Sequence, residues 1–221
     1  MYIFVLAAFV FAGLESLALW KGWRKLEFVA KPAVMVCLFA WLVLAGGLQG
    51  ALLWFVLGVL LSLAGDIALL FIDRFFAVGL AAFLLAHLAY LVGFNTPFPE
   101  LATIWSIGIA IVIGASAVRV MRPIVAGVRK KGQTRLAPPV ILYGVVITLM
   151  LLSALLTLFR PEWKSAPALL VSAGAFLFYL SDIALAWNRF VSPIRHGRML
   201  NIGLYHLGQI AIIAGVILQF G

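Results

Sequence analysis

Residues 50–72 read GALLWFVLGVLLSLAGDIALLFI, an apolar run that one acid, Asp66, interrupts. A helix needs about 20 predominantly apolar residues to cross a bilayer, and this run is long enough. Comparable runs cover residues 2–20, 31–46, 75–94, 102–120, 138–159, 166–187 and 199–219. The pattern predicts an all-α membrane protein, with eight transmembrane helices in a single integral membrane domain over residues 1–221.

The composition excludes most other classes of protein. Hydrophobic residues make up 66% of the 221 positions and charged residues 10%, whereas an ordinary soluble domain carries roughly 25% charged residues. A soluble enzyme, a disordered chain and a secreted disulfide scaffold are therefore excluded. The apolar runs do not alternate with the period of two that an outer-membrane barrel requires. The single cysteine, Cys37, lies within an apolar run and can form no internal disulfide.

The chain carries a net charge of +9, and its basic residues are distributed unevenly along the sequence. The odd-numbered connections between spans hold 14 of the 16 Lys and Arg residues, six of them in the central polar stretch Arg119–Pro138. Basic residues concentrate in cytoplasmic loops. We therefore expect the odd-numbered connections in the cytoplasm, both termini outside, and a bacterial-type inner membrane. The charge implies no nucleic acid, and the sequence implies no protein partner.

Two parts of the chain resemble each other. The stretch Asp66–Phe75 (DIALLFIDRF) aligns with Asp182–Phe190 (DIALAWNRF) after a one-residue gap, and His87 and His206 follow at corresponding places. Each half would hold four spans, so corresponding helices run in the same direction. We predict a parallel 4+4 internal repeat, with halves of about 1–120 and 121–221 and a pseudo-axis along the membrane normal. The alternative is chance similarity between two hydrophobic helices.

Three acids, Glu15, Asp66 and Asp182, lie deep inside predicted spans. Residue counting places them about 9–10 Å inside the cytoplasmic boundary, at the ~1.5 Å rise per residue of an α-helix. A charge at the bilayer centre costs at least about 3 kcal/mol, so such residues are candidates for function. Glu15 has a second interpretation, because it can snorkel toward Lys21 and Lys25.

Other polar residues lie on neighbouring spans. Counting places His206 and Tyr143 at a depth similar to that of the acids, and His87 nearer the midplane. Tyr90 and Gln209 follow the two histidines by three residues and so share their helix faces. We expect a polar cavity that opens toward the cytoplasmic leaflet, with the two aspartates facing one another. The alternative is that these residues are interhelical hydrogen-bonding partners.

Several short motifs carry a resemblance to a known family. They are Lys31-Pro32, Gly65-Asp66, GLAAFLLAHLAY at 79–90, Ser181-Asp182, Asn188-Arg189-Phe190 and YHLGQ at 205–209. In this order and spacing, which cover nearly the whole chain, they resemble the YhhN family, which includes the mammalian transmembrane lysoplasmalogenases. The resemblance implies a membrane hydrolase that cleaves the vinyl ether bond of lysoplasmalogens, giving a fatty aldehyde and a glycerophospho-base.

Vinyl ether hydrolysis begins with proton delivery to the β-carbon, which produces an oxocarbenium ion that water then attacks. The reaction suits a pair of carboxyl groups, as in glycosidases, so Asp66 and Asp182 are candidate catalytic residues. His87 and His206 are further candidates, because a histidine can act as the base or orient the water. No GxSxG motif occurs in the sequence, which disfavours ester hydrolysis through a serine. No cofactor is expected.

The expected substrate is a lysophospholipid within the membrane lipids. Lys31 and Arg189 are candidate ligands of its phosphate, which fixed cations bind best. The other candidate substrate-binding residues are Tyr90, Tyr143, Asn188, Tyr205 and Gln209. Two alternatives stay open: a metal site formed by the two aspartates and two histidines, although none is expected, and a proton-coupled transporter or lipid carrier that uses the same residues.

We predict that a reporter fused after Gly221 lies outside the cytoplasm, because the basic residues gather in the odd-numbered connections. Alkaline phosphatase fused at this position should be active in intact cells. Activity confined to a reporter that works only in the cytoplasm would overturn the topology.

Overall fold

The computed structural model describes residues 2–96 and 104–221. Within these residues, eight helices are long and apolar enough to cross a membrane, so the predicted eight-helix, all-α membrane protein is confirmed. They are α1 (Tyr2–Lys21), α2 (Arg24–Leu44), α3 (Leu52–Leu69), α4 (Ile72–Phe94), α5 (Ile104–Lys130), α6 (Ala137–Leu156), α7 (Ser165–Phe190) and α8 (Gly197–Phe220). Short 3₁₀ turns, η1 (Thr134–Leu136) and η2 (Thr157–Phe159), flank α6.

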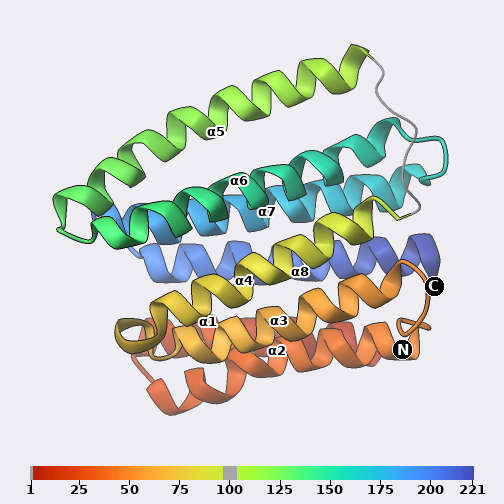
Figure 1. Cartoon of the computed structure of the whole chain (residues 1–221). Helices are drawn as coiled ribbons and strands as arrows, with labels where there is room; N and C mark the ends of the chain where they lie inside the picture. Colours follow the sequence, from red (N-terminus) through yellow and green to blue (C-terminus); the bar gives the residue numbers. More distant parts are fainter. Residues whose placement is uncertain (1, 97–103) are drawn as a thin grey trace.

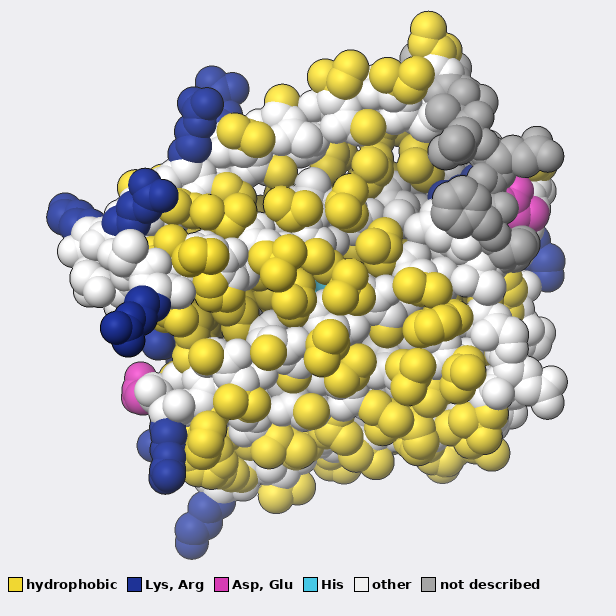
Figure 2. Space-filling model, viewed as in Figure 1, with side chains coloured by type: hydrophobic (Ala, Val, Ile, Leu, Met, Phe, Trp, Pro, Cys, Tyr) yellow, Lys and Arg dark blue, Asp and Glu magenta, His cyan; other side chains and the backbone are white. Residues whose placement is uncertain are grey.

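The helices lie side by side in one bundle, with both termini at the same end (Figure 1). Helix α7 packs along α8, α3 along α4, and α1 along α2, while α5 lies at the edge against α6 and α7. Figure 2 shows that hydrophobic side chains cover the middle of this face. Most of the Lys and Arg side chains visible there gather at the end of the bundle that holds the odd-numbered connections.

Helix α2 begins earlier than the sequence predicted. It starts at Arg24 instead of residue 31, and it carries Pro32 in its interior. A proline inside a helix removes one backbone hydrogen bond, but two ion pairs to other helices hold the extended part. Glu27 pairs with Arg198 of α8, and Lys31 pairs with Asp66 of α3. Such distant partners leave no mark in a local apolar pattern.

Helix α5 continues to Lys130, so the first part of the stretch predicted to be a central cytoplasmic loop, Arg119–Pro138, is helical. Ile124 and Val128 are buried, whereas Arg122 and Arg129 are exposed. This amphipathic spacing extends the helix beyond its apolar part. The prediction of a loop was wrong here, because the basic residues were taken to mark the end of the helix.

Glycines allow the closest helix pairs to approach. A Cβ on Gly174 of α7 would lie 2.7 Å from the carbonyl oxygen of Gly208, and a Cβ on Gly208 of α8 would lie 2.8 Å from that of Gly174. In the α3–α4 pair, Gly58 makes room for the ring of Tyr90. Small residues at such crossings bring the backbones into contact, which drives helix association in membranes.

Replacing Gly208 by leucine should lower the thermal stability of the protein in detergent, because the new side chain meets the α7 backbone. Overpacking of this kind costs about 1–3 kcal/mol or more. The matched control is Gly203→Leu in the same helix, since a Cβ at Gly203 has nothing within 4 Å. Equal melting temperatures for the two variants would contradict the close α7–α8 contact.

Candidate active site

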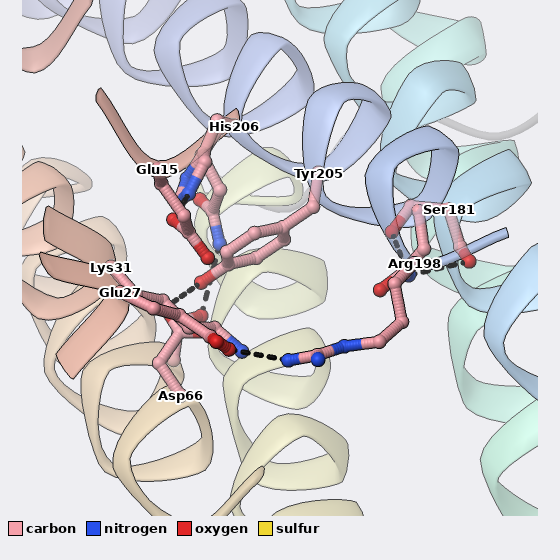
Figure 3. Close-up of polar contacts among 11 residues, drawn as sticks. Glu15, Glu27, Lys31, Asp66, Ser181, Arg198, Tyr205 and His206 are labelled. Atoms are coloured by element: carbon pink, nitrogen blue, oxygen red, sulfur yellow. Dashed lines mark hydrogen bonds and ion pairs between the residues drawn. The ribbon is translucent and has the colours of Figure 1, made fainter. Parts of the chain in front are cut away.

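Asp66 lies buried on α3 between a cation and a hydroxyl group. The Nζ of Lys31 is 3.4 Å from its Oδ1, and the hydroxyl of Tyr205 donates a 2.6 Å hydrogen bond to its Oδ2. Figure 3 shows these three side chains converging from α2, α3 and α8. The charge of Lys31 is therefore matched inside the protein. This contact was not predicted, because the sequence suggested that Lys31 meets a lipid phosphate.

Glu15 and His206 form a second buried pair beside Tyr205. The Nε2 of His206 is 2.5 Å from Oε2 of Glu15, and both side chains are fully buried. Figure 3 shows them pointing toward one another. Glu15 therefore lies in the buried polar cluster, and the snorkelling interpretation is wrong. Among the residues that the structure describes, Glu15 Oε1 and His206 Nδ1 have no hydrogen-bond partner.

Tyr90 and Gln209 connect three helices. The hydroxyl of Tyr90 on α4 donates a 2.7 Å hydrogen bond to Oε1 of Gln209 on α8. Gln209 in turn donates a 3.0 Å hydrogen bond from Nε2 to the Oγ of Ser62 on α3. All three side chains are buried. In this arrangement they tie α3, α4 and α8 together, as polar residues commonly do inside membranes.

Asp182 on α7 has a different set of partners. The hydroxyl of Tyr143 on α6 donates a short hydrogen bond to Oδ2 of Asp182, and Nε2 of His87 on α4 lies 3.6 Å from the same oxygen. The Nδ1 of His87 is 2.5 Å from the carbonyl oxygen of Phe83. A carbonyl oxygen only accepts hydrogen bonds, so Nδ1 carries a proton. In the neutral ring, Nε2 is then a proton acceptor that faces Asp182.

Aromatic rings lie between the two aspartate clusters. The centroid of the Phe178 ring is 4.6 Å from that of the His87 ring and 5.2 Å from that of the Tyr205 ring. His87 contacts Asp182, and Tyr205 contacts Asp66. The ring of Phe83 packs edge-on against both Phe178 and Tyr205. The structure thus brings each acid together with its own partners and joins the two groups through packed rings.

A narrow apolar cavity of about 60 Å³ lies beside Asp182, between α4, α5, α6 and α7. Its wall includes Phe76, Phe83, Met121 and Tyr143. Asp182 is the one acid among the described residues that line it, and its side chain is 12% exposed. Asp66 does not line this cavity.

Arg189 lies beside Phe76, a wall residue of this cavity, but does not itself line the cavity. Its guanidinium carbon is 4.0 Å from the centre of the Phe76 ring, which lines the cavity. Its Nε is buried without a hydrogen-bond partner among the described residues. The neighbouring Asn188 instead accepts a 2.9 Å hydrogen bond from the backbone of Ile194, and so holds the connection between α7 and α8.

The residues that sequence reasoning grouped together do not converge on one point. Among the described residues, no three His, Cys, Asp or Glu side chains are placed to hold a metal ion. Each aspartate instead has a neighbouring hydroxyl group, from Tyr205 or from Tyr143. Glu27, which pairs with Arg198 at the basic end of the bundle, was missed by the sequence analysis. A glutamate in a presumed connection gave no signal that it pairs with a residue 171 positions away.

The fold and the site together define an eight-helix integral membrane protein with carboxyl groups, histidines and tyrosines buried between its helices. The chain belongs to the YhhN family, whose model matches residues 26–216. The resemblance that the motifs indicated is thus confirmed. No solved structure matches the chain.

Curated relatives are similar to this chain over most of its length. The lysoplasmalogenase TMEM86B of Mus musculus is 29% identical over 220 residues, which cover 94% of this chain and 84% of that protein. The lysoplasmalogenase TMEM86B of Homo sapiens is 28% identical with the same coverage. That of Sus scrofa is 30% identical over 84% of this chain and 72% of that protein.

Replacing Lys31 by methionine should destabilise the protein by about 3–5 kcal/mol, the typical cost of leaving a buried charge unpaired. The variant Lys31→Met/Asp66→Asn should lose much less than the two single variants combined, because it leaves no uncompensated charge. The measurement is a double-mutant cycle of thermal stability in detergent. Strictly additive losses would show that the two side chains do not interact.

Proposed function

We propose that the protein is a lysoplasmalogenase, which hydrolyses the vinyl ether bond of a lysophospholipid within the membrane. The observation that carries the proposal is Asp182, a carboxyl group in the wall of an otherwise apolar cavity, with Tyr143 and His87 beside it. The names and coverage of the curated relatives support the same activity. An apolar wall with a few convergent polar groups is the usual lining of a ligand site, and a cavity of about 60 Å³ holds only the reacting part of such a lipid.

Asp182 is the proton donor in this proposal. Tyr143 donates its hydroxyl proton to Oδ2, which leaves Oδ1 to carry the proton that passes to the β-carbon of the vinyl ether. The C=C π bond supplies the electron pair for the new C–H bond, and an oxocarbenium ion results. The Asp182 carboxylate then stabilises this cation, as the carboxylates of glycosidases do.

His87 is the base for the second step. Its Nε2 accepts a proton as water adds to the oxocarbenium carbon, which gives a hemiacetal. In the collapse, the hemiacetal hydroxyl returns its proton to Asp182, the C–O bond to the glycerol breaks, and the leaving oxygen takes the proton from His87. One water is consumed, and both side chains regain their starting protonation states.

Asp66 is a positioning residue in this scheme. It forms an ion pair with Lys31, whereas Asp182 has a tyrosine and a histidine as its partners. Two carboxyl groups in such different surroundings serve different roles. Asp66 holds Tyr205, whose ring packs on Phe178, and Phe178 packs on His87.

Arg189 is the better candidate for the phosphate, because Lys31 is already neutralised by Asp66. Seven residues separate Arg189 from Asp182 along α7, about 10 Å at the helical rise. Seven bonds separate the vinyl ether β-carbon from the phosphorus, which is about 8 Å at the spacing of an extended chain. A phosphate at Arg189 therefore brings the reacting carbon to Asp182.

We also propose the parallel 4+4 repeat, with the odd-numbered connections in the cytoplasm. The pattern of contacts supports it. In each half the second helix supplies a partner to the aspartate of the third helix, Lys31 to Asp66 and Tyr143 to Asp182. The fourth helix of the opposite half supplies another partner, Tyr205 to Asp66 and His87 to Asp182.

Asp182→Asn should lower aldehyde release by about 10²–10⁴-fold, the usual contribution of an acid–base group, because asparagine cannot deliver the proton. The assay uses purified protein in detergent with a lysoplasmalogen and no ion gradient. Glu162→Gln is the matched control, since Glu162 is exposed in the connection between η2 and α7.

Near-normal turnover in Asp182→Asn would remove this residue from the chemistry. If the wild-type protein released no aldehyde from any vinyl ether lipid, the enzyme proposal would fail, and a proton-coupled carrier that uses the same residues would replace it.

A further inference from the structure

Helix α5 packs closely on α7 at its Lys130 end. A Cβ on Gly127 would lie 2.1 Å from the carbonyl oxygen of Phe190, so α5 touches the α7 backbone near its Lys130 end. A Cβ on Gly108 or Gly114 would have nothing within 4 Å. Figure 1 shows the Ile104 end of α5 standing away from α6. The two helices therefore diverge from the basic end of the bundle toward the other end.

A groove of about 580 Å³ follows this divergence between α5 and α6. Gly114, Val118 and Leu149 contribute to its apolar part, and Arg122 and Arg129 line the part toward the basic end. Its volume falls within the roughly 300–1,000 Å³ of sites that hold small molecules. The groove combines an apolar trough with two exposed cations at one end, which matches a lipid with one chain and an anionic headgroup.

Only a thin partition divides the groove from the cavity beside Asp182. Met121 and Gly144 line both spaces. A Cβ on Gly144 would lie 2.7 Å from the Sδ of Met121, so the methionine side chain rests on the glycine. Methionine is unbranched and adapts its shape readily. A rotation of this one side chain would join the two spaces.

We propose that the groove between α5 and α6 is the lateral access path and chain-binding site for a single-chain phospholipid. The inference rests on the proposed function and extends it. On entry the phosphate meets Arg122 and Arg129, and it moves to Arg189 when the vinyl ether bond reaches Asp182. The hydrocarbon chain lies along the groove toward Gly114. The eight residues from Arg122 to Gly114 span about 12 Å, close to the ~15 Å of hydrocarbon in one leaflet.

The position of Met121 links binding of the lipid in the groove to cleavage of its vinyl ether bond at Asp182. A vinyl ether bond lies directly between the headgroup and the chain of its lipid, and Met121, which lines both the groove and the cavity beside Asp182, directly precedes Arg122 along α5. When Met121 moves aside, the bond passes over Gly144 toward Asp182, while the chain stays in the groove. One trough holds one chain, which assigns the site to lysophospholipids and not to lipids with two chains.

Gly114→Phe tests the chain site, because a Cβ at this lining position meets open space and the added ring can extend into the groove. It should lower the ratio of kcat/KM for a long-chain lysoplasmalogen to that for a short-chain analogue by at least ~10-fold, the loss expected when a pocket rejects part of a ligand. Gly108→Phe is the matched control on the same helix, since its Cβ also meets open space and Gly108 does not line the groove. Equal ratios in the two variants would overturn the proposal.

A binding measurement separates this inference from the proposed activity. The probe is an alkyl ether lysophosphatidylcholine with a diazirine at the end of its chain, which has no vinyl ether bond to cleave. After photolysis, mass spectrometry should place the label on residues 110–118 or 145–149, and Gly114→Phe should lower the yield while Gly108→Phe leaves it unchanged. Label at other residues would overturn the proposal that the groove binds the lipid chain. Label in the groove of a protein that releases no aldehyde would support the lipid-binding site and contradict the proposed hydrolase activity.

Discussion

Every ionisable group inside this bundle must find a partner within the protein, because lipid supplies none and an isolated charge there is costly. Glu15 meets His206 of α8, Asp66 meets Lys31 of α2, and Asp182 meets Tyr143 of α6. These contacts fix which helices are neighbours at the level of the site. Glycines then allow the pairs to close, as at Gly174 and Gly208. Polar pairing therefore determines the arrangement, and apolar packing completes it.

The difference between the two aspartates follows from their partners. Asp66 of α3 faces a cation and a tyrosine, whereas Asp182 of α7 faces a tyrosine and a histidine nitrogen. Two similar carboxyl groups thus have different surroundings because the residues beside them differ. The packed rings of Phe178 and Tyr205 keep the two groups apart while holding both in place.

Local sequence patterns predicted the membrane helices and singled out Asp66 and Asp182, because apolar length and a buried acid are both local signals. The partners of these acids were not predictable in the same way. Tyr205 is 139 positions from Asp66, and Glu15 is 191 positions from His206. The boundaries that failed, at α2 and α5, lie where polar residues continue a helix because another helix or its own apolar face supports them.

The close contact between Gly127 and Phe190 is the point about which a tilt of α5 would turn. Gly114 lies 13 residues from Gly127, an arm of about 20 Å at the helical rise, so a tilt of about 10° would displace it by about 3 Å. The same tilt would shift backbone one turn from the pivot by less than about 1 Å. A tilt of α5 would therefore displace the part near Gly114 far more than the part that contacts Phe190.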